Sequence, residues 1–173
     1  MLKGTEAGLP LAGSSRKRRG IPKDSQLKTK EFLGLVADSL GEHLPQELRD
    51  FRVRGPVFSL VGILYAKDPR IHYEVWVQRR TGRLELGLHF EAEPETNTHW
   101  LEFFGRRAPR ILAALGPGVE AEQWTGSWTR LHESLPLEAL TRQYAERVAE
   151  RLGTFISVLE PMRREGEALV EKL

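Results

Sequence analysis

The chain contains no cysteine, and this absence removes several classes of mechanism at once. Without thiols there can be no disulfide framework, no thiolate metal site and no cysteine nucleophile. Long apolar runs are also missing, since nothing approaches the roughly 18 consecutive apolar residues that a membrane-spanning helix needs. The apolar patch 7–12 is broken by Gly8 and Pro10 and is too short for a secretory signal. We therefore expect a cytoplasmic protein with no membrane segment.

Catalytic signatures are equally scarce. There is no Gly-x-Ser-x-Gly elbow, and the turn Gly116–Gly118 lacks the Gly-Lys-Ser/Thr ending of a phosphate loop. Metal-dependent nucleases of the restriction type share a helix, three antiparallel strands and a helix, but they need an acid-x-Lys on the third strand. The corresponding segment Glu85–Gly87 has no lysine. These absences favour a protein that is not an enzyme.

The composition indicates one ordinary domain. With 173 residues, 40% of them apolar and 29% charged, the chain falls within the range of globular proteins. We expect a single α+β domain over residues 25–161, preceded by a disordered arm at 1–24 and followed by a charged C-terminal extension at 162–173. A single asparagine and two methionines fit a thermophile, although a GC-rich genome would produce the same bias.

The overall net charge of +2 conceals a marked asymmetry. Residues 1–30 carry eight basic and two acidic side chains, whereas the remainder has a net charge of −4. Residues 1–24 are rich in Gly, Ser and Pro and show no sustained periodicity, so they cannot bury enough apolar surface to offset the entropy of ordering. A basic arm therefore precedes a mildly acidic body.

The arm is the predicted nucleic-acid-binding element, because clustered cations neutralise phosphates and release counterions. The predicted nucleic-acid-binding residues are Arg16, Lys17, Arg18, Arg19 and Lys23. Two alternatives remain open. The arm could dock on an acidic protein partner, the acidic body of this chain included, or it could merely keep the chain soluble.

Hydrophobic periodicity predicts helices at both ends of the domain and one in the middle. The first runs from about Ser25 to Gly41, the second begins at Thr98 with a kink or break at Pro109, and the last is capped by Ser134. Pro161 should end or bend the last helix, beyond which the chain should fray.

Alternating or β-branched stretches predict about five strands. The predicted strands are 51–65 with a bend at Gly55 and Pro56, then 71–78, 84–92, 119–124 and 127–132. The order α-β-β-β-α-β-β-α describes a two-layer α+β sandwich, in which helices cover one face of a mainly antiparallel sheet.

The segment Ile71–Glu91 reads as a hairpin that turns at Thr81 and Gly82. Pairing Val75 with Leu88 makes one face wholly apolar, and it sets Glu74 against His89 and Trp76 against Gly87 on the other face. A slip by one residue would place apolar against polar side chains everywhere, so the burial of one face selects against it.

The polar face of this hairpin carries two His-x-Glu pairs, at His72, Glu74, His89 and Glu91. Imidazole and carboxylate groups on adjacent strands could converge on a metal ion, with the second hairpin as a cover. The alternative is two cross-strand ion or hydrogen-bond pairs on a solvated face. We favour the second interpretation and so predict no metal and no cofactor.

The tryptophans also allow two interpretations. They could stack on bases, as aromatic side chains on sheets do in single-strand binders, or they could belong to the core. The four are Trp76, Trp100, Trp124 and Trp128.

Residues 84–163 resemble an uncharacterised prokaryotic domain that is often attached to nuclease modules of restriction or defence systems. The resemblance lies in a strand, the segment Ile111–Gly116, a strand containing Trp124, and a helix that ends with Phe155–Pro161. It covers less than half of the chain and shares no catalytic motif. The element order also resembles the fold of type III secretion chaperones, which implies a protein-binding role without chemistry.

Three functional hypotheses follow. The first is a non-enzymatic interaction domain that associates with nucleic acid through its arm, within a larger assembly or a homodimer. The second is a protein-binding module of chaperone or adaptor type that uses a groove beside the last helix. The third is a metal-dependent enzyme that uses the His/Glu sheet face.

Overall fold

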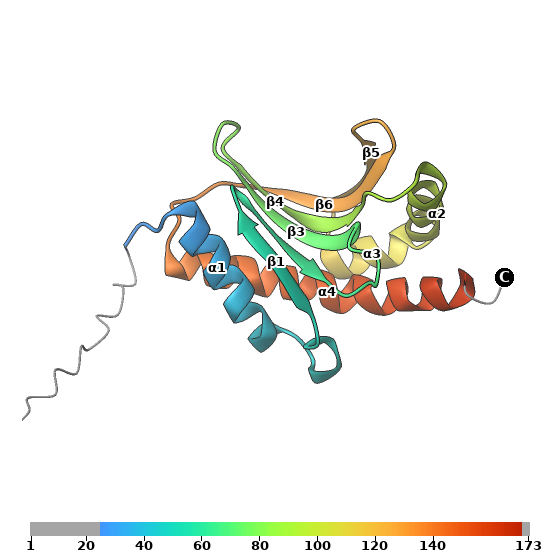
Figure 1. Cartoon of the computed structure of the whole chain (residues 1–173), viewed down its shortest axis with the longest axis horizontal. Coiled ribbons are helices and arrows are strands. Elements are labelled where there is room, and N and C mark those ends of the chain that lie inside the picture. The colour runs from blue at the N-terminus through green and yellow to red at the C-terminus, as the bar shows by residue number, and fades with distance from the viewer. Residues whose placement is uncertain (1–24, 171–173) are drawn as a thin grey trace, which may run out of the picture.

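The computed structural model describes residues 25–170 and shows a six-stranded antiparallel sheet with helices packed on one face (Figure 1). This confirms the predicted two-layer α+β sandwich. The arm residues Arg16, Lys17, Arg18, Arg19 and Lys23 lie outside the described residues, so their predicted role is not tested. No helix within 25–170 is long and apolar enough to cross a membrane.

The sheet has the strand order β1-β2-β3-β4-β6-β5, so β1 and β5 form its two edges. The strands are β1 (Arg52–Val57), β2 (Leu60–Leu64), β3 (Ile71–Gln78), β4 (Arg83–Phe90), β5 (Val119–Trp124) and β6 (Trp128–Pro136). The connection from β4 through two helices returns the chain so that β6, and not β5, pairs with β4. This topology places the second hairpin directly beside the first.

Within the described residues, four α-helices and two short 3-10 helices complete the fold. They are α1 (Thr29–Ser39), η1 (Leu40–His43), η2 (Gln46–Leu48), α2 (Pro94–Gly105), α3 (Ala108–Leu115) and α4 (Arg142–Val170). The long helix α4 runs beneath the sheet, with α1 beside it, and α2 and α3 cover the end near β5 and β6 (Figure 1).

The core lies between the sheet and these helices. Alternate residues of β3 and β4 point towards α1 and α4, as the alternation of the sequence predicts. Tyr73 and Phe90 are 1% and 0% exposed, which confirms that they face inward. Phe90 also stacks on Trp100 of α2 at 5.6 Å between ring centroids, so Trp100 belongs to the core.

The predicted register of the first hairpin is wrong by two residues. His72 lies opposite His89, Glu74 opposite Gly87 and Trp76 opposite Glu85, because the turn contains the four residues 79–82. A shift of two residues keeps every side chain on its predicted face, so burial alone could not distinguish the two registers.

Several element boundaries also differ from the prediction. The predicted bent strand 51–65 is two strands, because the chain reverses at Phe58 and Ser59 and β1 pairs with β2. The second helix begins at Pro94 and is divided near Pro109, as the proline predicted. The last helix begins at Arg142 instead of after Ser134, because residues up to Pro136 continue β6 alongside β4.

The last helix does not end at Pro161. Helix α4 continues to Val170, and Met162 and Arg163 are buried. The helix therefore crosses the boundary at which we predicted a separate C-terminal extension.

Candidate binding site on the concave sheet face

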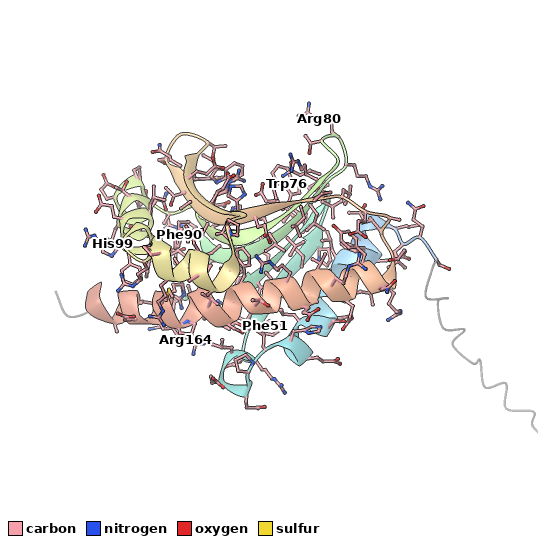
Figure 2. All side chains as sticks on the ribbon, turned by 180° about the vertical axis from the view of Figure 1, so that it is seen from behind. Phe51, Trp76, Arg80, Phe90, His99 and Arg164 are labelled. Atoms are coloured by element: carbon pink, nitrogen blue, oxygen red, sulfur yellow. The ribbon has the colours of Figure 1, made fainter. Side chains whose placement is uncertain are left out.

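The sheet face opposite α4 is concave, because the loops of both hairpins rise away from the helix layer (Figure 1). Figure 2 shows Trp76 on this face, between the two raised hairpins. The face is polar but largely shielded from water. Its buried ionisable side chains are His72, Glu74, Glu85, His89 and His132.

Gly87 permits the close packing of strands at the middle of this face. A Cβ atom at this position would overlap the carbonyl oxygen of Leu131 and lie 2.7 Å from Cα of His132. No real Cβ tolerates such contacts with backbone atoms. Glycine in a strand interior often marks such a close approach or bend, so Gly87 is required where β4 meets β6.

His72 is held at the centre of the first hairpin by groups on three sides. Its Nδ1 lies 3.1 Å from the carbonyl oxygen of Pro69, and its Nε2 lies 3.0 Å from Nη2 of Arg54. In this geometry Nδ1 donates to the carbonyl and Nε2 accepts from the guanidinium. The ring also stacks on His89 at 5.8 Å between centroids. Both nitrogens of His72 are therefore occupied by protein groups.

Glu74 lies next to this histidine, with Oε2 3.5 Å from Nε2 of His72. Burial alone would raise the pKa of Glu74, but the nearby His72, His89 and Arg54 side chains together outweigh it and lower the pKa. Glu74 is therefore an anion at neutral pH.

Arg130 of β6 joins the two hairpins through two carboxylates. Its Nη1 donates to Oε1 of Glu85 at 2.5 Å, while Nε and Nη2 donate to Oε1 of Glu122 at 3.0 and 2.6 Å. The guanidinium also lies 4.4 Å from the ring centroid of Trp124. The hydrogen bonds from Arg130 are the main cause of the lowered pKa of Glu122.

His132 is buried beside this cluster, yet neither of its ring nitrogens makes a hydrogen bond. Its Nε2 lies 3.0 Å from Oε1 of Glu122 and 4.0 Å from Oε2 of Glu120. Burial and the charge of Arg130 lower the pKa of His132, so its imidazole is neutral at pH 7.

A groove with a volume of about 420 Å³ opens on this face between the β1–β2 hairpin and the β5–β6 hairpin. We call it the tryptophan groove. It is lined by Arg54, Val57, Leu60, Glu74, Trp76, Glu91, Trp124 and Trp128. Trp124 lies 6.4 Å from Trp76 and 6.0 Å from Trp128 between ring centroids, so the three indoles form a continuous aromatic wall.

Exposed apolar side chains occur in the lining of the groove and in the adjoining β1–β2 turn. Phe58, at the turn between β1 and β2, is 92% exposed and adopts a φ of 51°. This left-handed conformation is unfavourable for a bulky residue. Val57 and Trp128 are 50% and 37% exposed. Exposed apolar patches of this kind mark interaction surfaces.

The four residues of the predicted His/Glu metal site are neighbours, with the rings of His72 and His89 stacked, but they do not converge as one group of ligands. His72 contacts Glu74 of the same strand and His89 contacts Glu91 just after β4, and both nitrogens of His72 are already occupied. Within residues 25–170, the group of three such residues whose imidazole and carboxylate atoms all lie within 4.8 Å of one another is Glu120, Glu122 and His132.

Sequence reasoning proposed the second hairpin as a cover for the site but did not identify Glu120, Glu122 and Arg130 as site residues. The sequence did contain a signal for this cluster. Glu120 and Glu122 are two residues apart on one predicted strand, and Arg130 and His132 are two residues apart on the next. Pairing of β5 with β6 sets Glu120 opposite His132 and Glu122 opposite Arg130. What this signal could not show is that β6 lies next to β4.

Compared with known protein families, with curated proteins and with solved structures, the chain shows no significant match to any of them.

Proposed function

We propose that this protein is a non-enzymatic interaction domain whose folded body binds a partner protein at the tryptophan groove. The observation that carries the proposal is the aromatic wall of the groove, beside the exposed side chain of Phe58. Aromatic side chains are enriched among the residues that contribute most to binding at protein interfaces. The proposed surface differs from the predicted groove beside the last helix, because it lies on the opposite face of the sheet.

The charge of the groove indicates what kind of side chain it accepts. Glu74 and Glu91 contribute two carboxylates, and Arg54 contributes one guanidinium that donates to His72 and to the carbonyl of Pro69. A net negative charge beside indole faces suits a cationic side chain, through ion pairing and cation–π attraction. We infer that the partner inserts a basic residue between apolar contacts.

The test is site-specific photo-crosslinking in the native host, with a photoreactive phenylalanine analogue at position 58. The same analogue at Leu112 of α3 is the matched control, because Leu112 is 42% exposed and does not line the groove. A partner crosslinked from position 58 and not from position 112 would then be purified. Its affinity should fall by about 5- to 30-fold for Phe58→Ser and also weaken for Glu91→Gln, which are ordinary effects for an interface contact.

Equal crosslinking from both positions, or an affinity that neither substitution changes, would contradict the proposal. A crosslink to a second copy of this chain would show that the partner is the protein itself and that the groove is a homodimer interface.

Nucleic-acid association through the arm is the second candidate function. It is supported by the four consecutive basic residues Arg16–Arg19. The resemblance of residues 84–163 to a domain attached to defence nucleases points in the same direction. The tryptophan groove itself does not suit phosphates, since its lining contains two carboxylates and one guanidinium group.

A further inference from the structure

Three potential metal ligands gather where β5 and β6 form the edge of the concave face, and none of them lines the tryptophan groove. They are His132 from β6 and Glu120 and Glu122 from β5. The pairing of the strands sets Glu120 directly opposite His132, and Glu122 follows two residues later on the same face. One ligand atom from each lies within 4.8 Å of the other two.

The buried imidazole of His132 distinguishes this cluster from an ordinary group of surface acids. The residue is 5% exposed, and neither ring nitrogen has a hydrogen-bond partner. A buried polar atom without a partner is costly and uncommon in folded proteins. The Nε2 atom is the one that approaches both carboxylates.

The distances suit a small divalent cation. Two ligands of a tetrahedral zinc ion, each at about 2.0–2.1 Å from the metal, lie roughly 3.4 Å apart. The separations from Nε2 of His132 are 3.0 Å to Glu122 and 4.0 Å to Glu120, which bracket this value. The side chain of Glu120 is 73% exposed and is therefore free to adjust.

We propose that His132, Glu122 and Glu120 form a binding site for a divalent cation of the zinc class, with the remaining coordination position open to water. Imidazole and carboxylate oxygen are both zinc ligands. The partial exposure of Glu120 and Glu122 gives the ion a route of entry from solvent.

Neighbouring groups support the histidine and balance the charge. Oε2 of Glu85 lies 3.7 Å from Nδ1 of His132, beyond hydrogen-bond distance, and places a carboxylate on the side of the ring away from the two ligand carboxylates. Arg130 opposes a cation, but it already binds both Glu85 and Glu122. Together the three carboxylates around Arg130 and His132 leave a formal charge of −2, which a divalent ion neutralises.

The experiment is a calorimetric titration of untagged, chelator-treated full-length protein with Zn²⁺. We expect one ion per chain, with affinity at least tenfold weaker in Glu120→Gln and lost in His132→Ala. His99→Ala is the matched control, because His99 is an exposed histidine on α2 and its removal should leave zinc affinity unchanged. Circular dichroism establishes that each variant is folded.

If His132→Ala does not fold, Glu120→Gln still tests the proposal, because residue 120 is exposed and its substitution should not disturb folding. Co²⁺ provides a second readout, because the visible absorption of the bound ion reports its coordination and should change in Glu120→Gln. The proposal is overturned if the unaltered protein binds no zinc, or if the unaltered protein and Glu120→Gln bind it equally. No partner protein takes part, so this outcome is independent of the proposed function.

Discussion

At the scale of single residues, Gly87 has the most exacting environment on the concave face. Its strand neighbours Leu86 and Leu88 are core residues, so the sequence around it reads as an ordinary buried strand. The backbone of β6 nevertheless approaches so closely that a side chain at this position would meet Leu131 and His132. A single missing Cβ thus allows β4 and β6 to bring their polar side chains together.

Replacing Gly87 by alanine should lower the free energy of unfolding by about 1–3 kcal/mol or more, as overpacking does, because backbone atoms must move to admit the methyl group. Gly34→Ala is the control. Gly34 lies in α1, where an added methyl group would have no neighbour within 4 Å, and alanine there should stabilise by about 0.5–1 kcal/mol. Urea denaturation measures the free energy of unfolding of both variants. Similar stability of Gly87→Ala and the unaltered protein would refute the close approach of the strands.

At the scale of elements, α4 carries a buried ionic cluster that contacts the sheet through the hydroxyl of Tyr73. Glu160 is 0% exposed and accepts hydrogen bonds from Arg163 at 2.9 Å, from Arg164 at 3.1 Å and from the hydroxyl of Tyr73 at 3.3 Å. Burial would lower the pKa of Arg163, but its hydrogen bonds to Glu160 raise it above the usual value. Arg163 therefore remains charged beneath the sheet.

Removing one partner of this pair should cost much more than removing both. Arg163→Met leaves the buried carboxylate of Glu160 without its main partner and should destabilise the protein by about 3–5 kcal/mol. The double variant Glu160→Leu with Arg163→Met should be considerably more stable than the sum of the two single effects implies. A double-mutant cycle measured by chemical denaturation decides this, and additive effects would show that the two side chains do not interact.

At the scale of the whole molecule, the uneven charge of the chain separates two candidate binding functions. The concave face of the body combines aromatic side chains with carboxylates, a chemistry that favours cations over phosphates. The basic residues Arg16–Arg19 belong to the arm. Any strong affinity for nucleic acid is therefore expected to depend on the arm and not on the groove.

Deletion of residues 1–24 should abolish salt-dependent binding to duplex DNA. If the four cations of Arg16–Arg19 each neutralise a phosphate, the logarithm of the binding constant should fall with the logarithm of salt concentration with a slope of about −3.6. Fluorescence anisotropy over a range of salt concentrations measures this slope. Phe58→Ser is the control, because it alters the groove and leaves the arm intact, and unchanged binding after the deletion would remove the arm as the cause.

Much of the fold follows from local pattern. The alternation of Val75 and Val77 with Glu74 and Trp76 determines which face of β3 is buried, because successive side chains of a strand point to opposite sides. Pro109 likewise determines a break in the middle helical region, since proline lacks the donor that a helix requires. The register of the first hairpin could not be predicted from this alternation, because registers two residues apart bury the same side chains.

The sequence by itself determined the layered α+β architecture, the inward face of the first hairpin and the separation of a basic arm from an acidic body. Tertiary structure decided which polar residues meet. His132 and Trp124 reach the first hairpin because β6 pairs with β4 and the sheet curves there. That pairing follows from burying apolar side chains of both hairpins against one helix layer, a requirement of the whole chain that no local pattern contains.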